Sequence, residues 1–164
     1  MIRSLLVLLL FAAMGYAAPA STSGESSGTA ADSTVRWFKY SDALKIAKIQ
    51  KKLVFVDLYA DWCVPCRVMD VNVYRDPKVV KLLNERFLPV KLDVDSQKKI
   101  LCDGKIKTVQ RCYYDVWELK ALPALVLVAP KGMSILTVTQ SMSAYEMEYL
   151  LNQFLSKEQE WIAR

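Results

Sequence analysis

The sequence predicts an α/β protein in which a central sheet is flanked by helices. Apolar runs typical of buried strands recur along the chain, and segments with helical spacing of apolar residues separate them. A Cys-x-x-Cys motif stands where the first apolar run passes into a helix. At 164 residues the chain is long enough for one domain with a sizeable core and too short for two ordinary ones.

The first 20 residues predict a signal peptide. Arg3 precedes an apolar stretch at 5–14, which has the length of an export signal and is too short to span a membrane. Ala18 and Ala20 are the small residues that a signal peptidase inspects, so we expect cleavage after Ala20. An uncleaved anchor is the alternative. After cleavage we expect no stable membrane insertion.

Residues 21–34 are rich in Ser, Gly and Thr and predict a flexible linker, so the folded domain is expected at 35–164. The net charge of +5 is mild and its charges are interspersed, which predicts no nucleic-acid partner. The sequence contains no histidine, which excludes a Cys-His protease dyad, attachment of c-type haem and a Cys/His zinc site. We expect neither a cofactor nor a metal.

The first elements follow from local patterns. Residues 37–40 predict a short strand or a docked arm, and Ser41 is the expected N-cap of a helix that ends at Lys51-Lys52. The apolar run 53–59 predicts a central strand buried on both faces, in which Asp57 is unusual.

The next helix begins near Cys63 and breaks around residues 72–74. Asp76-Pro77 starts another helix, and residues 88–94 predict a strand that begins near Pro89.

The second half is less regular. Asp103-Gly104 indicates a turn, and a helix is predicted over 107–119. Residues 124–129 and 135–139 predict a hairpin of two strands. Ser143 is the expected cap of the last helix.

The Cys63-Val64-Pro65-Cys66 motif favours a redox pair. A cysteine at a helix N-terminus meets the positive end of the helix dipole, so Cys63 is the predicted nucleophile. Cys66, one turn further in, is expected to be less exposed and to act as the resolving thiol. A structural disulfide and half of a zinc site are the alternatives.

The element order resembles a thioredoxin fold over residues 37–154, with a central mixed sheet flanked by helices and a cysteine-containing insertion before Pro123. The stretches 57–66 and 74–79 resemble the periplasmic C-terminal thioredoxin-like domain of bacterial transmembrane disulfide-reductase proteins and single-domain exported relatives. Three departures from common thioredoxins are Val64 in place of glycine, a missing glycine around 139–141 and the longer segment before Pro123. They leave the choice of partner open.

The resemblance implies roles for individual residues. Asp57 matches a buried acid that moves the proton of the resolving thiol, and Lys91 matches a lysine that tunes this acid. Pro123 matches a cis-proline whose preceding residue presents its backbone to a partner strand. The implied substrate-contact residues are Trp62, Val64, Pro65, Leu122 and Pro123.

Cys102 and Cys112 lie in the insertion. A structural disulfide between them is the favoured interpretation, because the chain is expected to be exported and closing this loop restrains the unfolded state. A second redox pair is the alternative. Their spacing fits no standard zinc ligand set.

These observations predict an exported thiol-disulfide oxidoreductase, in the bacterial periplasm by the resemblance. It acts mainly as a reductant, because its flanking residues are reductase-like and no histidine lies between Cys63 and Cys66. The expected partners are disulfide-containing exported proteins and a membrane thiol reductase that supplies electrons. An oxidase or isomerase using the same pair, or a non-catalytic binding module, is the alternative.

Overall fold

A computed structural model describes residues 33–163. The predicted signal peptide lies outside the described residues, as does all of the predicted linker except its last two residues. No helix among residues 33–163 is both long enough and apolar enough to cross a membrane.

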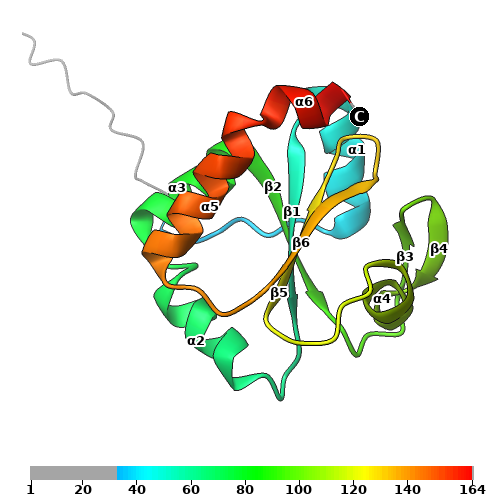
Figure 1. The fold of residues 1–164 in the computed structure, drawn as a ribbon, viewed down its shortest axis with the longest axis horizontal. Coiled ribbons are helices and arrows are strands. Elements are labelled where there is room, and N and C mark those ends of the chain that lie inside the picture. The colour runs from blue at the N-terminus through cyan, green and yellow to red at the C-terminus, as the bar shows by residue number, and fades with distance from the viewer. Residues whose placement is uncertain (1–32, 164) are drawn as a thin grey trace, which may run out of the picture.

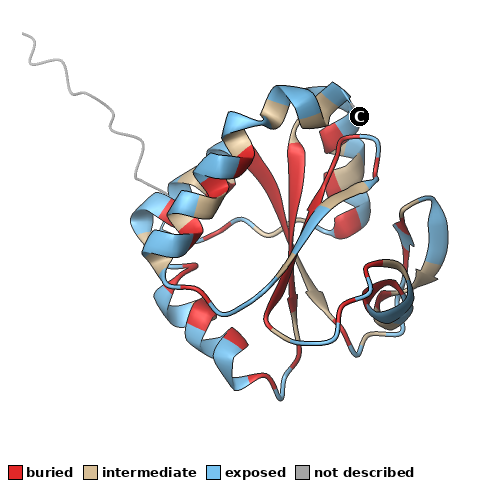
Figure 2. Cartoon of the chain, viewed as in Figure 1, coloured by how far each residue is buried: buried red, intermediate tan, exposed pale blue. Residues whose placement is uncertain are grey.

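A four-stranded sheet with the order β2-β1-β5-β6 forms the centre of the fold (Figure 1). Strand β1 (Leu53–Tyr59) pairs in parallel with β2 (Phe87–Asp93) and antiparallel with β5 (Ala124–Val128). Strand β6 (Ser134–Thr139) completes the predicted hairpin with β5. The sheet is therefore mixed, and β1 is central and buried along almost its whole length (Figure 2), as its continuous apolar run predicts.

Helices cover both faces of this sheet (Figure 1). Successive residues of a strand point to opposite faces, so Val56 joins the core beneath α1 (Tyr40–Gln50), whereas Phe55 joins the core beneath α3 (Pro77–Arg86) and α5 (Ala144–Ser156). The two apolar faces of β1 thus hold two helical layers in place.

Two of the predicted helix starts are confirmed. Asp76 caps α3 by accepting hydrogen bonds from backbone N–H groups of the first turn, and Pro77 occupies the first helical position. Ser143 and Glu146 form a reciprocal capping box at the start of α5. A short helix, α6 (Glu158–Ala163), follows α5.

Two predicted boundaries are wrong. Helix α1 begins at Tyr40 with Lys39 as its N-cap, so Ser41 lies inside the helix and no side chain caps it. Strand β2 begins before Pro89, which is tolerated within the strand because β2 is an outer strand of the four-stranded sheet. Phe38 forms an isolated parallel bridge to Val90 of this strand, so the predicted arm is docked there.

The insertion between β2 and β5 differs from the prediction. Strands β3 (Lys99–Cys102) and β4 (Lys105–Thr108) form a separate hairpin around the expected turn, and two short helical segments follow, α4 (Val109–Arg111) and the π-helical η1 (Cys112–Val116). The predicted helix over 107–119 is therefore too long at both ends, because residue 107 lies in β4 and the helical segments end at Val116. Four-residue strands that pair only with each other are too short for alternation of apolar residues to reveal them.

Candidate active site

The two cysteines of the Cys-x-x-Cys motif lie where β1 leads into helix α2 (Val64–Asn72). Cys63 is the N-cap of α2, and the two residues form a disulfide with a Cα separation of 5.3 Å. The backbone N–H of Cys66 donates a hydrogen bond of 3.2 Å to Sγ of Cys63. The Cys63 sulfur therefore faces the positive end of the α2 dipole, which stabilises a thiolate there.

The expected difference in exposure between the two cysteines is absent. Cys63 is 3% exposed and Cys66 is 4% exposed in the oxidised protein. Both side chains belong to the apolar core on the α1 side of the sheet, because the disulfide holds Cys63 against the start of α2. Exposure therefore does not distinguish the two cysteines, whereas the start of α2 favours a thiolate at Cys63.

Asp57 is the one buried charged side chain among the described residues, with 3% exposure. It lies on β1, and the hydroxyl of Tyr74 donates a hydrogen bond of 2.9 Å to its Oδ1. Burial raises the pKa of Asp57 from 3.8 to about 6, while the Lys91 ammonium and the Tyr74 hydroxyl oppose this rise. A carboxyl group with this pKa exchanges protons close to neutral pH.

Lys91 lies opposite Asp57 in the parallel pairing of β1 with β2. Its Nζ is 3.6 Å from Oδ2 of Asp57 and also forms an ion pair with Asp70 of α2. The ammonium group lies 4.9 Å from the ring centroid of Tyr59 and 5.6 Å from that of Trp37. One cation thus connects the strand that precedes the cysteines to the helix that carries them, and it is shielded by aromatic rings.

Sequence reasoning missed three residues of this arrangement. Tyr74 belongs to a stretch that carries the family resemblance, but nothing in its local pattern assigns it to Asp57. Asp70 lies one helical turn after Cys66, and this spacing is the signal that places it on the same helix face. Asp95 accepts a hydrogen bond of 2.8 Å from Nε1 of Trp62, a contact between loops that no sequence pattern indicates.

An apolar surface surrounds the disulfide. Trp62 is 65% exposed, so it is not a core aromatic residue, and its bond to Asp95 fixes the indole ring. Val64 and Pro65 are exposed at the start of α2. The Leu122–Pro123 peptide bond is cis, Pro123 is buried, and Leu122 packs against the apolar cluster that includes both cysteines.

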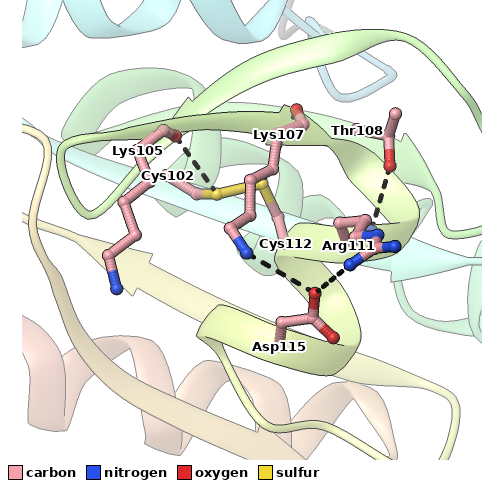
Figure 3. A network of polar contacts seen from close by, with 7 residues as sticks. All are labelled: Cys102, Lys105, Lys107, Thr108, Arg111, Cys112 and Asp115. Carbon is pink, nitrogen blue, oxygen red and sulfur yellow. Dashed lines mark hydrogen bonds and ion pairs between the residues drawn. A yellow bond between two sulfur atoms is a disulfide. The ribbon is translucent and has the colours of Figure 1, made fainter.

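The second pair of cysteines is separate from the first. Cys102 and Cys112 form a disulfide with a Cα separation of 6.1 Å, which joins β3 to η1 (Figure 3). Both side chains are fully buried. Asp115 forms ion pairs with Lys107 at 3.5 Å and with Arg111 at 3.3 Å, so β4 and the helical segments are also held together by charge.

A mixed sheet covered by helices on both faces, with a Cys-x-x-Cys disulfide at the start of a helix, defines a thioredoxin-like thiol-disulfide oxidoreductase. Comparison with known proteins agrees with this class. A family model described as "Thioredox_DsbH: Protein of unknown function, DUF255" matches residues 25–158, and the chain belongs to this family.

Relatives with sequence similarity include larger redox proteins. The thiol:disulfide interchange protein DsbD of Pseudomonas fluorescens is 42% identical over 91 residues, which are 55% of this chain and 14% of that protein. DsbD 1 of Pseudomonas aeruginosa is 30% identical over 117 residues, which are 71% of this chain and 17% of that protein. The chain thus spans less than a fifth of the length of these relatives.

Solved structures show the same fold. A thioredoxin from Thermus thermophilus superimposes with a TM-score of 0.61 at 25% identity, covering 76% of this chain and 90% of that chain. A structure titled "DsbH Oxidoreductase" superimposes with a TM-score of 0.55 at 16% identity, covering 81% of this chain and 88% of that chain. The predicted thioredoxin fold is therefore confirmed.

Proposed function

We propose that the protein is exported to the bacterial periplasm and reduces disulfides of other exported proteins through Cys63 and Cys66. The observation that carries the proposal is the position of this pair at the N-terminus of α2, directly after the strand that holds Asp57 with its raised pKa. The pair supplies two electrons, and Asp57 supplies a base for the one proton that must move between the steps.

The reaction proceeds in two exchanges. The Cys63 thiolate attacks one sulfur of the substrate disulfide, which forms a mixed disulfide and releases one substrate thiolate. The Cys66 thiol then loses its proton to a base, for which Asp57 on the preceding strand is the proposed residue, and the resulting thiolate attacks Sγ of Cys63. The Cys63–Cys66 disulfide forms, the second substrate thiolate leaves, and the substrate has gained two electrons.

The hydrogen bonding of Cys63 supports the reductive direction. Strongly oxidising pairs over-stabilise their thiolate and so favour their reduced form. Among residues 33–163, Sγ of Cys63 accepts one hydrogen bond, from the N–H of Cys66, and Val64 and Pro65 supply no side-chain donor. If the Cys63 thiolate keeps only this donor in the reduced protein, its reduced form is not over-stabilised, which favours electron donation.

The surface around the pair is the proposed substrate site. The exposed side chains of Trp62, Val64 and Pro65 would contact the substrate on one side of the disulfide, and the backbone at Leu122 and Pro123 on the other. An oxidising compartment requires a source of electrons, and the resemblance to DsbD makes a membrane thiol reductase the proposed donor.

Reduction of insulin disulfides with a chemical thiol as electron source tests the proposal. Cys63→Ser is expected to abolish turnover, and Cys66→Ser is expected to accumulate a mixed disulfide that is visible on a non-reducing gel. A double variant, Cys102→Ala with Cys112→Ala, is the matched control and is expected to keep its turnover. Undiminished turnover by Cys63→Ser would assign the activity to another group.

A further inference from the structure

A groove separate from the cysteine pair lies on the α1 side of the fold. It has a volume of about 680 Å³, which falls within the range of small-molecule sites. Helix α1, the β3–β4 hairpin and the turn between β5 and β6 form its walls, and Figure 1 shows these elements side by side, away from the start of α2. Neither Cys63, Cys66 nor Asp57 lines it.

The floor of this groove is apolar. Aliphatic and aromatic side chains from the docked arm, α1, β2 and the hairpin meet there, namely Phe38, Leu44, Leu92, Ile100, Leu101 and Ile106. Ile106 is largely exposed to solvent and Leu101 is also exposed. These side chains form a contiguous apolar surface in a recess, which is a feature of binding sites.

The rim of the groove is strongly basic. Lysines from every wall surround the apolar floor, namely Lys39, Lys45, Lys48, Lys98, Lys99 and Lys131, and no aspartate or glutamate lines the groove. Lys91 of β2 also lines it, but its ammonium group is paired with Asp57 and Asp70. Lys48 and Lys98 take part in none of the ion pairs formed among residues 33–163. The groove therefore combines an apolar floor with a positive potential that favours an anion.

The start of α1 adds to the positive potential of the groove. No side chain caps this helix, and residues 39–41 of its first turn line the groove, so the positive helix end faces it. Tyr40 is 4% exposed, and its buried hydroxyl has no hydrogen-bond partner among the described residues. This hydroxyl is closed to solvent, and the charge that acts on it is the Asp103 carboxylate at the tip of the hairpin.

The wall opposite α1 is held in place without a ligand. Asp103, at the tip of the β3–β4 hairpin, accepts hydrogen bonds of 2.5 Å from the backbone N–H and 2.6 Å from the hydroxyl of Ser134. The Cys102–Cys112 disulfide fixes the other side of the hairpin (Figure 3). A site whose walls are already ordered loses little freedom when it binds.

We propose that this groove binds a small amphiphilic anion, a carboxylate with an unbranched acyl chain. The chain would lie on the apolar floor, and the carboxylate would lie among the lysines near the start of α1. The groove contains neither cysteine nor Asp57, and the one residue it shares with the redox site is Lys91, whose ammonium group is paired with Asp57 and Asp70. The inference therefore does not depend on the redox function.

Titration of the purified protein with decanoate tests the proposal, with backbone amide shifts as the readout of position. Saturable shifts confined to α1 and the β3–β4 hairpin are expected, with weaker binding at high salt. Decanol lacks the charge and decyltrimethylammonium reverses it, so both are expected to bind at least about tenfold more weakly. If decanol bound as tightly as decanoate, the lysines would not be the groups that hold the carboxylate.

Paired variants locate the site. Lys48→Glu with Lys98→Glu reverses one charge on each of two walls and is expected to weaken decanoate binding by at least about tenfold. Lys81→Glu with Lys120→Glu makes the same change in net charge outside the groove and is expected to leave binding within about twofold. Ile106→Gln changes an exposed floor residue and is expected to weaken binding without unfolding the protein. An equal loss of decanoate affinity in the control pair would show that decanoate does not bind in this groove.

A second experiment distinguishes a free carboxylate from a membrane lipid as the source of the anion. Vesicles that contain an anionic phospholipid present negative charge and acyl chains in a bilayer, whereas decanoate presents them free in solution. Displacement of decanoate by a short-chain anionic lipid but not by vesicles is expected. Binding to vesicles without binding to decanoate, or no saturable binding to either, would overturn the proposal.

Discussion

Replacement of Asp57 by Asn is expected to stabilise the fold at neutral pH while it slows the reaction. Burial raises the pKa of Asp57 from 3.8 to about 6, so the charged carboxylate is disfavoured in the folded state. A rise of roughly two pKa units corresponds to about 3 kcal/mol. Asn carries no charge, and its side-chain oxygen can still accept the hydrogen bond from Tyr74.

Because the pKa of Asp57 is raised in the folded state, the stability gained by Asp57→Asn depends on pH. Folded Asp57 binds a proton more tightly than the unfolded chain, so its contribution to the free energy of unfolding is present below about pH 4 and is lost as the pH rises to about 6. The stability advantage of Asp57→Asn should therefore be near zero at about pH 4 and should reach about 3 kcal/mol at about pH 7.

Urea denaturation at a series of pH values measures this difference directly. Asp61→Asn is the matched control, because it makes the same chemical change at an exposed position just after β1. A constant difference for Asp57→Asn would refute the reasoning. So would a variant that is less stable than the parent protein at neutral pH.

Three other changes have defined outcomes. Lys91→Met removes the cation that opposes the effect of burial on the pKa of Asp57, so the acidic limb of the pH–rate profile for insulin reduction should move to higher pH. Loss of the second disulfide in Cys102→Ala with Cys112→Ala should cost about 3 kcal/mol of unfolding free energy, measured by urea denaturation, for a loop of about ten residues. Trp62→Ala should raise KM for a protein substrate with little change in thermal stability, because the indole ring is exposed.

Local sequence patterns predicted the elements that depend on near neighbours. The apolar run at 53–59 identifies β1 because a strand buried on both faces is apolar at nearly every position, and Asp57 is the exception. Asp76 with Pro77, and Ser143 with Glu146, identify two helix starts because capping groups act within one turn. The Cys63–Cys66 motif can also be recognised from the sequence, because its residues lie within one turn at the start of a helix.

Other features depend on residues that the fold brings together. The bond from Tyr74 to Asp57 joins positions 17 apart in sequence, and the ion pair of Lys91 with Asp70 joins positions 21 apart. The first contact depends on the placement of the end of α2 against β1, and the second on the placement of α2 against β2. No local pattern determines either placement. The β3–β4 hairpin was missed because its strands pair only with each other. The pattern of apolar residues there does not distinguish a strand from a helix.

The reduction potential of the Cys63–Cys66 pair tests the proposed direction of electron flow most directly. The measurement uses the variant without Cys102 and Cys112, equilibrated with thiol buffers of defined potential. The measured potential then belongs to the Cys63–Cys66 disulfide alone. The proposed reductase predicts a value near that of thioredoxin, about −270 mV. A value near about −120 mV would contradict it, because a pair with that potential donates its disulfide to substrates.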